Sequence, residues 1–183
     1  AGDITNFGPL EPVDSVLSRF EVPCFAIPGN CDPREIIDVL ERSDTICLHN
    51  SWIALGKITL AGFGGSNTTP FGTPFELTEE EIDSELTRIV NHMDRNIHNV
   101  LLSHAPPYGV LDSVGENHVG SRSIRKHMTR FDLICCAHIH EARGIVEVDG
   151  VRVVNPGPAS EGYGALIHFG KEPKDIDIEL ISV

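Results

Sequence analysis

Two histidines, His138 and His140, are separated by one residue and follow directly on the apolar run 131–137. In extended backbone, side chains at positions i and i+2 point to the same face, so we expect both imidazoles to face one spot. Neutral imidazole is the commonest metal ligand among side chains. Metal binding is therefore the first chemistry that this spacing indicates, and its remaining ligands must come from elsewhere in the chain.

Three other predicted strand ends carry polar side chains: Asp3 in "AGD", Asn30 in "IPGNCD" and His104 in "LLSH". In an open α/β sheet, ligand sites form beyond the carboxyl ends of the strands, where neighbouring loops converge. One carboxylate, one amide oxygen and three imidazoles suit divalent metals such as manganese, iron, zinc, cobalt or nickel. Two such ions can clamp a phosphate and lower the pKa of a bound water.

Each of these residues also has an ordinary explanation. A lone histidine is more often hydrogen-bonded or exposed than metal-bound, Asp3 could be loosely held, and Asn30 after a glycine could adopt a left-handed turn. The order of all five residues at strand ends favours the metal site instead. The other histidines lack this context, and we expect them to be structural or exposed: His49, His92, His98, His127 and His168.

Short apolar strands alternate with amphipathic helices along the chain, which predicts an α/β fold, with a β-rich last third, in one domain over residues 1–183. The helix predicted over 32–42 begins with Asp32 as N-cap and Glu35 completing a capping box. The helix over 77–95 has the same signal in Thr78 and Glu81. Buried strands are expected at 22–30, 98–104 and 131–137, and a hairpin turns at Asp149–Gly150.

The chain is strongly acidic, with 14 Lys and Arg against 27 Asp and Glu in 183 residues. This balance excludes a DNA- or RNA-coating role, which needs a basic surface. A phosphate-bearing substrate would need local positive charge from a metal or a helix terminus. Five cysteines without CxxC spacing indicate a reducing compartment, and no apolar run approaches the length of a membrane span. We therefore expect a cytoplasmic protein.

Four segments, "GDITNFG", "PGNCD", "LLSHAPPYG" and "AHIHEARG", resemble the later motif blocks of the calcineurin-like metallophosphoesterase family. The resemblance implies a four-layer αββα sandwich of two mixed β-sheets with a dinuclear metal centre between them. It implies that Asp3 bridges both metals, that Asn30, His104 and His138 hold one metal, and that His140 reaches the other. A small-molecule phosphodiester or phosphomonoester would be hydrolysed there by attack of a metal-bound hydroxide. A homo-oligomer is left open.

The chain departs from the family pattern in two places. The D-x-H block and the strand that should precede Asp3 are missing, so we expect an N-terminally incomplete sequence. Cys31 stands where the family usually has its general-acid histidine, as in the small bacterial and archaeal phosphodiesterase branch with a GNCD motif. Cysteine is a poorer proton shuttle near neutral pH, and Cys31 could equally be a small turn residue.

Two rival functions and three neighbouring segments remain open at this level. The fold could serve as a protein-interaction module with a degraded metal site, or His138 and His140 could belong to a single-metal hydrolase of another fold. The loop 64–76 could border a substrate or be a surface connection. The predicted helix start at Ser121 could accept an anion, and "NPGPAS" is interpreted as an architectural turn.

Overall fold

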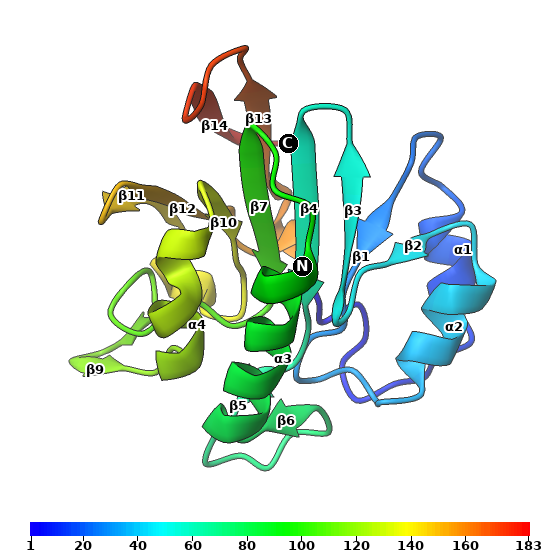
Figure 1. The fold of residues 1–183 in the computed structure, drawn as a ribbon. Helices are drawn as coiled ribbons and strands as arrows, with labels where there is room; N and C mark the ends of the chain where they lie inside the picture. Colours follow the sequence, from blue (N-terminus) through cyan, green and yellow to red (C-terminus); the bar gives the residue numbers. More distant parts are fainter.

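The computed structural model describes residues 1–183 as an α/β fold built on a mixed six-stranded sheet (Figure 1). The strand order is β11-β12-β10-β7-β4-β3, in which β4, β7, β10 and β12 run parallel and the two edge strands run antiparallel to their neighbours. The bounds are β3 (Ser51–Leu55), β4 (Ile58–Phe63), β7 (His98–Ser103), β10 (Leu133–Cys135), β11 (Gly144–Val148) and β12 (Val151–Asn155). The predicted fold class is thereby confirmed.

Alternation of apolar residues gives the central sheet two buried faces. On β7, Leu101 points into a large core that it shares with helices α3 (Glu79–His92) and α4 (Arg122–His127). Val100 points to the opposite face, where the antiparallel pair β13 (Tyr163–Phe169) and β14 (Ile176–Ser182) covers it. The period of two along each strand therefore places the helices on one side and a strand pair on the other.

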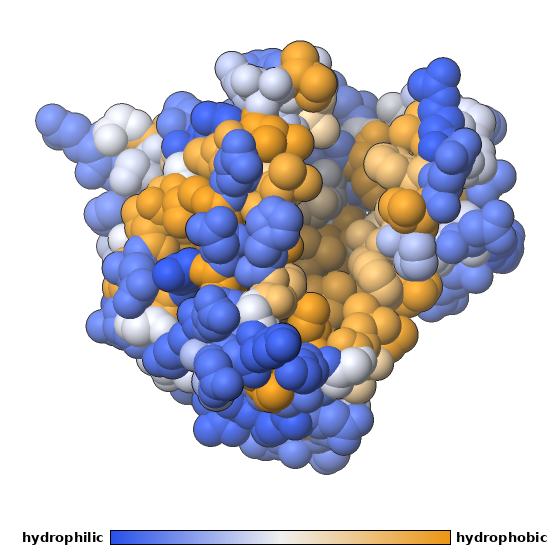
Figure 2. Space-filling view, turned by 90° about the horizontal axis from the view of Figure 1, so that it is seen from above, coloured by the Kyte–Doolittle hydropathy of each residue, from blue (hydrophilic) through white to orange (hydrophobic).

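The second layer of strands consists of two separate pairs rather than one continuous sheet. Besides β13–β14, it contains the parallel pair β1 (Phe25–Ala26) and β2 (Ile46–Cys47), against which α1 (Val13–Leu17) and α2 (Ile36–Arg42) pack. The two pairs share no hydrogen-bonded ladder, since β1 bonds only to β2 and β13 bonds only to β14. The elements α1, α2, β1 and β2 form a lobe, here called the outer lobe. Seen from above, a hollow with largely hydrophobic walls lies beside it (Figure 2).

Local sequence signals predicted some element boundaries and missed others. The capping box of α3 is confirmed, since the Thr78 hydroxyl accepts from Glu81 N–H at 3.2 Å and the Glu81 carboxylate accepts from Thr78 N–H at 2.8 Å. The predicted start of α2 was wrong: the helix begins at Ile36, and its N-cap Glu35 makes no side-chain cap bond. Asp32 is used elsewhere.

The hairpin between β11 and β12 turns at Asp149–Gly150 as predicted, with positive φ at both residues. Two further short pairs lie within connections: β5 (Ser66–Asn67) with β6 (Glu76–Leu77), and β8 (Ser113–Val114) with β9 (Asn117–His118). Single 3₁₀ turns span Met128–Arg130, His140–Ala142 and Ala159–Glu161. No helix in the structure combines the length and the apolar composition that crossing a membrane requires.

Candidate metal centre

Four of the five predicted ligands line one cavity, three of them beyond the carboxyl ends of β7 and β10, whereas Asp3 was predicted at a strand end and follows no strand. Asp3, His104, His138 and His140 line one cavity of about 600 Å³. Asn30 is buried behind this wall, and its Oδ1 lies 2.8 Å from His104 Nε2. Segments far apart in the sequence thus supply one cluster of carboxylate, amide and imidazole groups.

The imidazole of His104 has an oxygen atom next to each of its ring nitrogens. Nδ1 lies 2.7 Å from the Ala1 carbonyl oxygen, and Nε2 lies 2.8 Å from Asn30 Oδ1 and 3.5 Å from Asp3 Oδ2. Burial lowers the pKa of His104 to about 4, so the ring is neutral at pH 7 and carries a single N–H. One hydrogen cannot serve oxygen atoms on both sides of the ring.

The nitrogen that carries this hydrogen decides which side of the ring can accept a cation. With the Nδ1–H donating to the Ala1 carbonyl, three electron pairs face one another without a hydrogen, those of His104 Nε2, Asn30 Oδ1 and Asp3 Oδ2. Two atoms that bind one ion at about 2.1 Å lie roughly 3 Å apart at a right angle and about 3.4 Å apart at a tetrahedral angle. The two distances from His104 Nε2 are 2.8 and 3.5 Å, close to this range. The donor set fits a divalent metal of the manganese-to-zinc series.

The other two histidines extend the cluster. The His138 ring lies 5.0 Å from that of His104, centroid to centroid, and burial lowers its pKa to about 4, so it too is neutral and free to ligate. His140 is exposed and lines the same cavity. No group of three or more side chains of the His, Cys, Asp and Glu types is arranged to hold an ion, and the nearest oxygen to His104 Nε2 belongs to the Asn30 amide.

The conformation around His138 differs from the extended one predicted. Strand β10 ends at Cys135, His138 adopts a left-handed conformation with φ 67°, and His140 opens a 3₁₀ turn. The expectation that alternation along a strand aligns the two imidazoles was therefore wrong. They reach the same cavity because the chain turns sharply between them, at a bend that no helix or strand period encodes.

Asp32 joins the two turns that carry Asp3 and Asn30. Its buried carboxylate accepts hydrogen bonds from the backbone N–H groups of Ile4 (3.1 Å), Thr5 (2.7 Å) and Gly29 (2.8 Å), and from the Thr5 hydroxyl (2.9 Å). The sequence pattern assigned this residue to capping a helix. Its position next to the ligand-bearing "PGN" segment was the signal that could have indicated a role in the site.

The same two turns pack backbone against backbone. A Cβ added at Gly29 would lie 2.1 Å from Asp3 N, and one added at Gly2 would lie 2.5 Å from Gly29 Cα. Only glycine permits this approach. Asp3, itself left-handed with φ 50°, accepts the Cys31 N–H at Oδ1 with 2.9 Å, which leaves Oδ2 facing His104.

Cys31 borders the cavity with its thiol. Burial, followed by the neighbouring Asp3 carboxylate, raises the pKa of Cys31 to about 11. The thiol is therefore protonated at neutral pH and holds its proton more tightly than an imidazolium would. This makes it a weak acid for a leaving group.

The predicted anion site at Ser121 is filled by the protein itself. Glu79 accepts from the Ser121 hydroxyl (2.9 Å), from Arg122 N–H (2.9 Å) and from Ser123 N–H (2.8 Å). A carboxylate of α3 thus satisfies the N-terminus of α4, and the two helices are joined there. No free anion site remains at this helix end.

The loop 64–76 does not border the cavity, whereas the "NPGPAS" segment, interpreted as an architectural turn, does. In the loop, Phe75 is buried, Phe71 is 84% exposed, and no residue lines the ligand cavity. Residues 155–160, interpreted as architecture, do line it, together with Tyr163. Asn155 donates to the Ile139 carbonyl at 2.7 Å and accepts from Gly157 N–H at 3.0 Å, so it also fixes the histidine turn.

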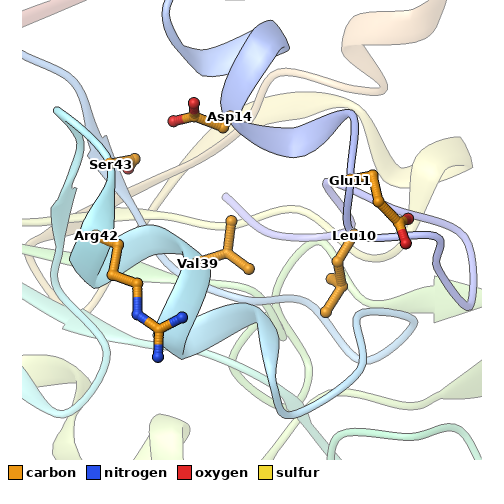
Figure 3. Close-up of a pocket in the computed structure, with 6 residues that line it drawn as sticks. All are labelled: Leu10, Glu11, Asp14, Val39, Arg42 and Ser43. Atoms are coloured by element: carbon orange, nitrogen blue, oxygen red, sulfur yellow. The ribbon is translucent and has the colours of Figure 1, made fainter.

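A second cavity of about 420 Å³ lies on the outer lobe between α1 and α2. Figure 3 shows Asp14 of α1 above Arg42 and Val39 of α2, with Leu10 and Glu11 to the right. It contains no histidine or cysteine and is separate from the convergent strand ends. The chemistry-bearing residues are in the larger cavity.

The fold places carboxylate, amide and imidazole groups at one cavity, as the resemblance to metallophosphoesterases implies, and the comparison with known families shows the class. The family model for the calcineurin-like phosphoesterases matches residues 1–142, and the chain belongs to that family. The uncharacterized protein MJ1162 of Methanocaldococcus jannaschii is 41% identical over 172 residues, covering 87% of this chain and 76% of that protein. The UPF0046 protein K07C11.7 of Caenorhabditis elegans is 30% identical over 110 residues, covering 57% of this chain and 37% of that protein.

Solved structures share the fold. The crystal structure of TT1561 of Thermus thermophilus superposes with a TM-score of 0.71 at 19% identity, covering 99% of this chain and 83% of that one. Another crystal structure reaches a TM-score of 0.76 at 22% identity, covering 94% of this chain and 70% of the other. At these identities the likeness concerns the fold alone.

Proposed function

We propose that this chain is a metal-dependent phosphoesterase that hydrolyses phosphodiesters or phosphomonoesters of small molecules at a dinuclear centre. The observation that carries the proposal is the close approach of Asn30 Oδ1 and Asp3 Oδ2 to His104 Nε2, at 2.8 and 3.5 Å, three atoms that a cation would join. Membership of the calcineurin-like phosphoesterase family supports the reaction class.

The ligand roles follow the geometry and the family resemblance. Asn30, His104 and His138 would hold one ion, Asp3 would bridge, and His140 would reach a second ion. When bound, divalent ions supply positive charge to phosphoryl oxygens and make water more acidic. That charge is needed here because the chain carries a formal net charge of −13.

The protein's own residues would orient the substrate and exclude water. Residues 155–160 and Tyr163 line the same cavity as the proposed ligands, and its volume of about 600 Å³ would leave room for an organic substituent on the phosphate. Cys31 can offer its thiol proton, but with a pKa of about 11 it favours substrates whose leaving group needs little protonation. The resemblance to the GNCD branch supports phosphodiesters.

Cellular location is part of the same proposal. All five cysteines are free, although Cys135 and Cys136 are neighbours in sequence. Free thiols suit a reducing compartment, and we place the protein in the cytoplasm.

The proposed function is tested by measuring the metal content of the wild type and comparing its activity with that of His138→Ala. We expect the wild type, dialysed with Mn²⁺, to hold two ions per chain and to hydrolyse bis(p-nitrophenyl) phosphate. His138→Ala should lose about 100-fold or more in kcat while its circular dichroism stays unchanged, because one ligand of the ion is lost. His168→Ala is the matched control, since this histidine lies on β13 outside the cavity and should keep wild-type rates.

The outcomes separate the alternatives. One ion per chain with activity would indicate a single-metal hydrolase. A wild type that takes up no metal and hydrolyses no ester of a diester and monoester panel would support an interaction module. Wild-type rates in His138→Ala would refute the site.

A further inference from the structure

The side-chain amide of Asn30 is held from both ends. Its Oδ1 faces His104 Nε2 at 2.8 Å, and its Nδ2 donates to the Thr73 hydroxyl oxygen at 3.0 Å and, over a longer 3.6 Å, to Cys31 Sγ. Only the oxygen end of an amide can bind a cation, because the NH₂ end has no free electron pair. Whichever group fixes the rotation of this amide therefore decides whether Asn30 is a ligand.

The direction of the Thr73 hydroxyl is fixed in turn by Glu76. The Thr73 O–H donates to Glu76 Oε1 at 2.7 Å, and the Thr73 backbone N–H donates to the same oxygen at 2.8 Å. The Thr69 hydroxyl is a third donor to Oε1. An ionised carboxylate has no hydrogen to donate, so all three of these groups donate to Glu76. The Thr73 hydroxyl has one hydrogen, and that hydrogen is directed at Glu76. Toward Asn30, the hydroxyl oxygen can therefore only accept.

We propose that Thr73 and Glu76 are positioning residues that hold the Asn30 amide with its oxygen toward the metal. This inference rests on the proposed function, since it assigns a supporting shell to one of the proposed ligands. It gives the loop 64–76 a role that neither earlier interpretation contained. The loop supports a ligand from behind instead of bordering the substrate.

The loop is built to keep Thr73 in place. Phe75 is buried at 2% exposure, and its backbone N–H donates to the Asn30 carbonyl at 3.0 Å. On the other side, the Arg34 guanidinium donates to the Glu76 carbonyl at 2.8 Å and stacks on the Phe75 ring. The backbone that follows Thr73 is thus bonded to the segment that carries Asn30. The Thr73 hydroxyl and the Asn30 amide are therefore kept within hydrogen-bond distance.

Metal affinity is the direct measurement. Titration calorimetry of the full chain with Mn²⁺ should show Thr73→Val binding about tenfold more weakly than wild type, the usual scale for loss of a group that orients a ligand. Thr73→Ser keeps the hydroxyl and should stay within about twofold. Glu76→Gln should weaken binding as well, because its amide can donate to Thr73 and free the hydroxyl hydrogen to turn toward Asn30.

Two controls distinguish positioning from general loosening of the loop. Thr69→Val removes a donor to the same carboxylate without touching Asn30, and it should bind Mn²⁺ within about twofold of wild type. In an Asn30→Asp background both ends of the side chain are oxygen, so Thr73→Val should cause no further weakening. This double-mutant cycle isolates the orientation of the amide from every other effect of Thr73.

The results have distinct meanings. Equal Mn²⁺ affinity of wild type and of folded Thr73→Val and Glu76→Gln would overturn the inference while leaving the proposed function intact. Equal weakening by Thr73→Val in the wild-type and Asn30→Asp backgrounds would also overturn it, because the effect would then not pass through the amide. A wild type that binds no Mn²⁺ would overturn the proposed function and this inference with it.

Discussion

The protonation states of individual side chains limit what the cavity can do. His104 and His138 both have pKa values lowered to about 4 by burial, so at neutral pH they offer electron pairs and no positive charge. Neutral imidazoles do not attract phosphate by themselves, but they are the form that ligates a metal. Burial of these two residues, which would disfavour phosphate binding in a metal-free site, is therefore consistent with their proposed role as ligands.

Cys31 is the residue whose replacement should change the substrate range. We expect Cys31→His to raise kcat for an alkyl phosphodiester by about 100-fold, the lower range for general acid catalysis, because an imidazolium gives up its proton far more readily than a thiol of pKa about 11. For a nitrophenyl phosphodiester, whose leaving group needs no proton, the change should be less than about threefold.

Steady-state rates on the two esters, with Cys31→Ser as the matched variant, check this expectation. The serine variant should resemble wild type on both esters, since its hydroxyl is no better a proton donor. Loss of activity on both esters in Cys31→His and in Cys31→Ser would contradict it, because the thiol would then have a role other than weak acid.

At the level of elements, the site depends on turns that are joined across the chain. Asp32 holds the turn after Gly2 against the turn after Pro28 through four hydrogen bonds. Asp32→Ala would leave three backbone N–H groups, one of them buried and two partly buried, and a hydroxyl without this partner. We expect it to lower the free energy of unfolding by roughly 3 kcal/mol or more.

Urea unfolding of the metal-free protein measures this loss without any contribution from bound ions. Asp14→Ala, an exposed acidic position on α1, is the control and should change the free energy by less than about 0.5 kcal/mol. If Asp32→Ala unfolds at the same urea concentration as Asp14→Ala, the two turns are held together by something other than this carboxylate.

The comparison of these elements with the sequence shows which features a linear pattern can encode. The end of β7 and the capping box of α3 follow from local periodicity and residue type, so the position of His104 directly after a buried strand could be predicted. No strand precedes Asp3, whose place beside His104 depends instead on contacts with residues 29–32. The partners of Asp32 at Ile4 and Thr5 lie 28 and 27 residues away, and the partner of Glu79 at Ser121 lies 42 residues away. Such contacts have no local signal. The left-handed turn at His138 likewise depends on distant partners such as Asn155.

On the scale of the whole molecule, the negative net charge and the burial of the histidines both limit the positive charge available in the cavity. The chain carries a net charge of −13, which repels polyanions and also phosphate esters. The interior holds three neutral histidines, because burial lowers the pKa values of His49, His104 and His138 to about 4. Positive charge in the cavity must therefore come from bound ions, and in their absence the buried imidazoles make folding sensitive to acid.

That sensitivity has a definite sign and range. The unfolded chain binds protons on these three histidines near pH 6.5, whereas the folded, metal-free chain does so only near pH 4, so acid favours the unfolded state. The free energy of unfolding in EDTA should be constant with respect to these groups above about pH 6.5 and should fall between about pH 6.5 and 4, by up to about 1.4 kcal/mol per pH unit for each group.

His49→Gln, which lies outside the ligand cluster, should remove roughly one third of that slope. Saturating Mn²⁺ should oppose the rest, because ions that bind His104 and His138 compete with protons for the same electron pairs. An unfolding free energy that stays flat from about pH 7 to about pH 4.5 in EDTA would show that these imidazoles are hydrated, and the electron pairs assigned to the metal would then already be bonded to water.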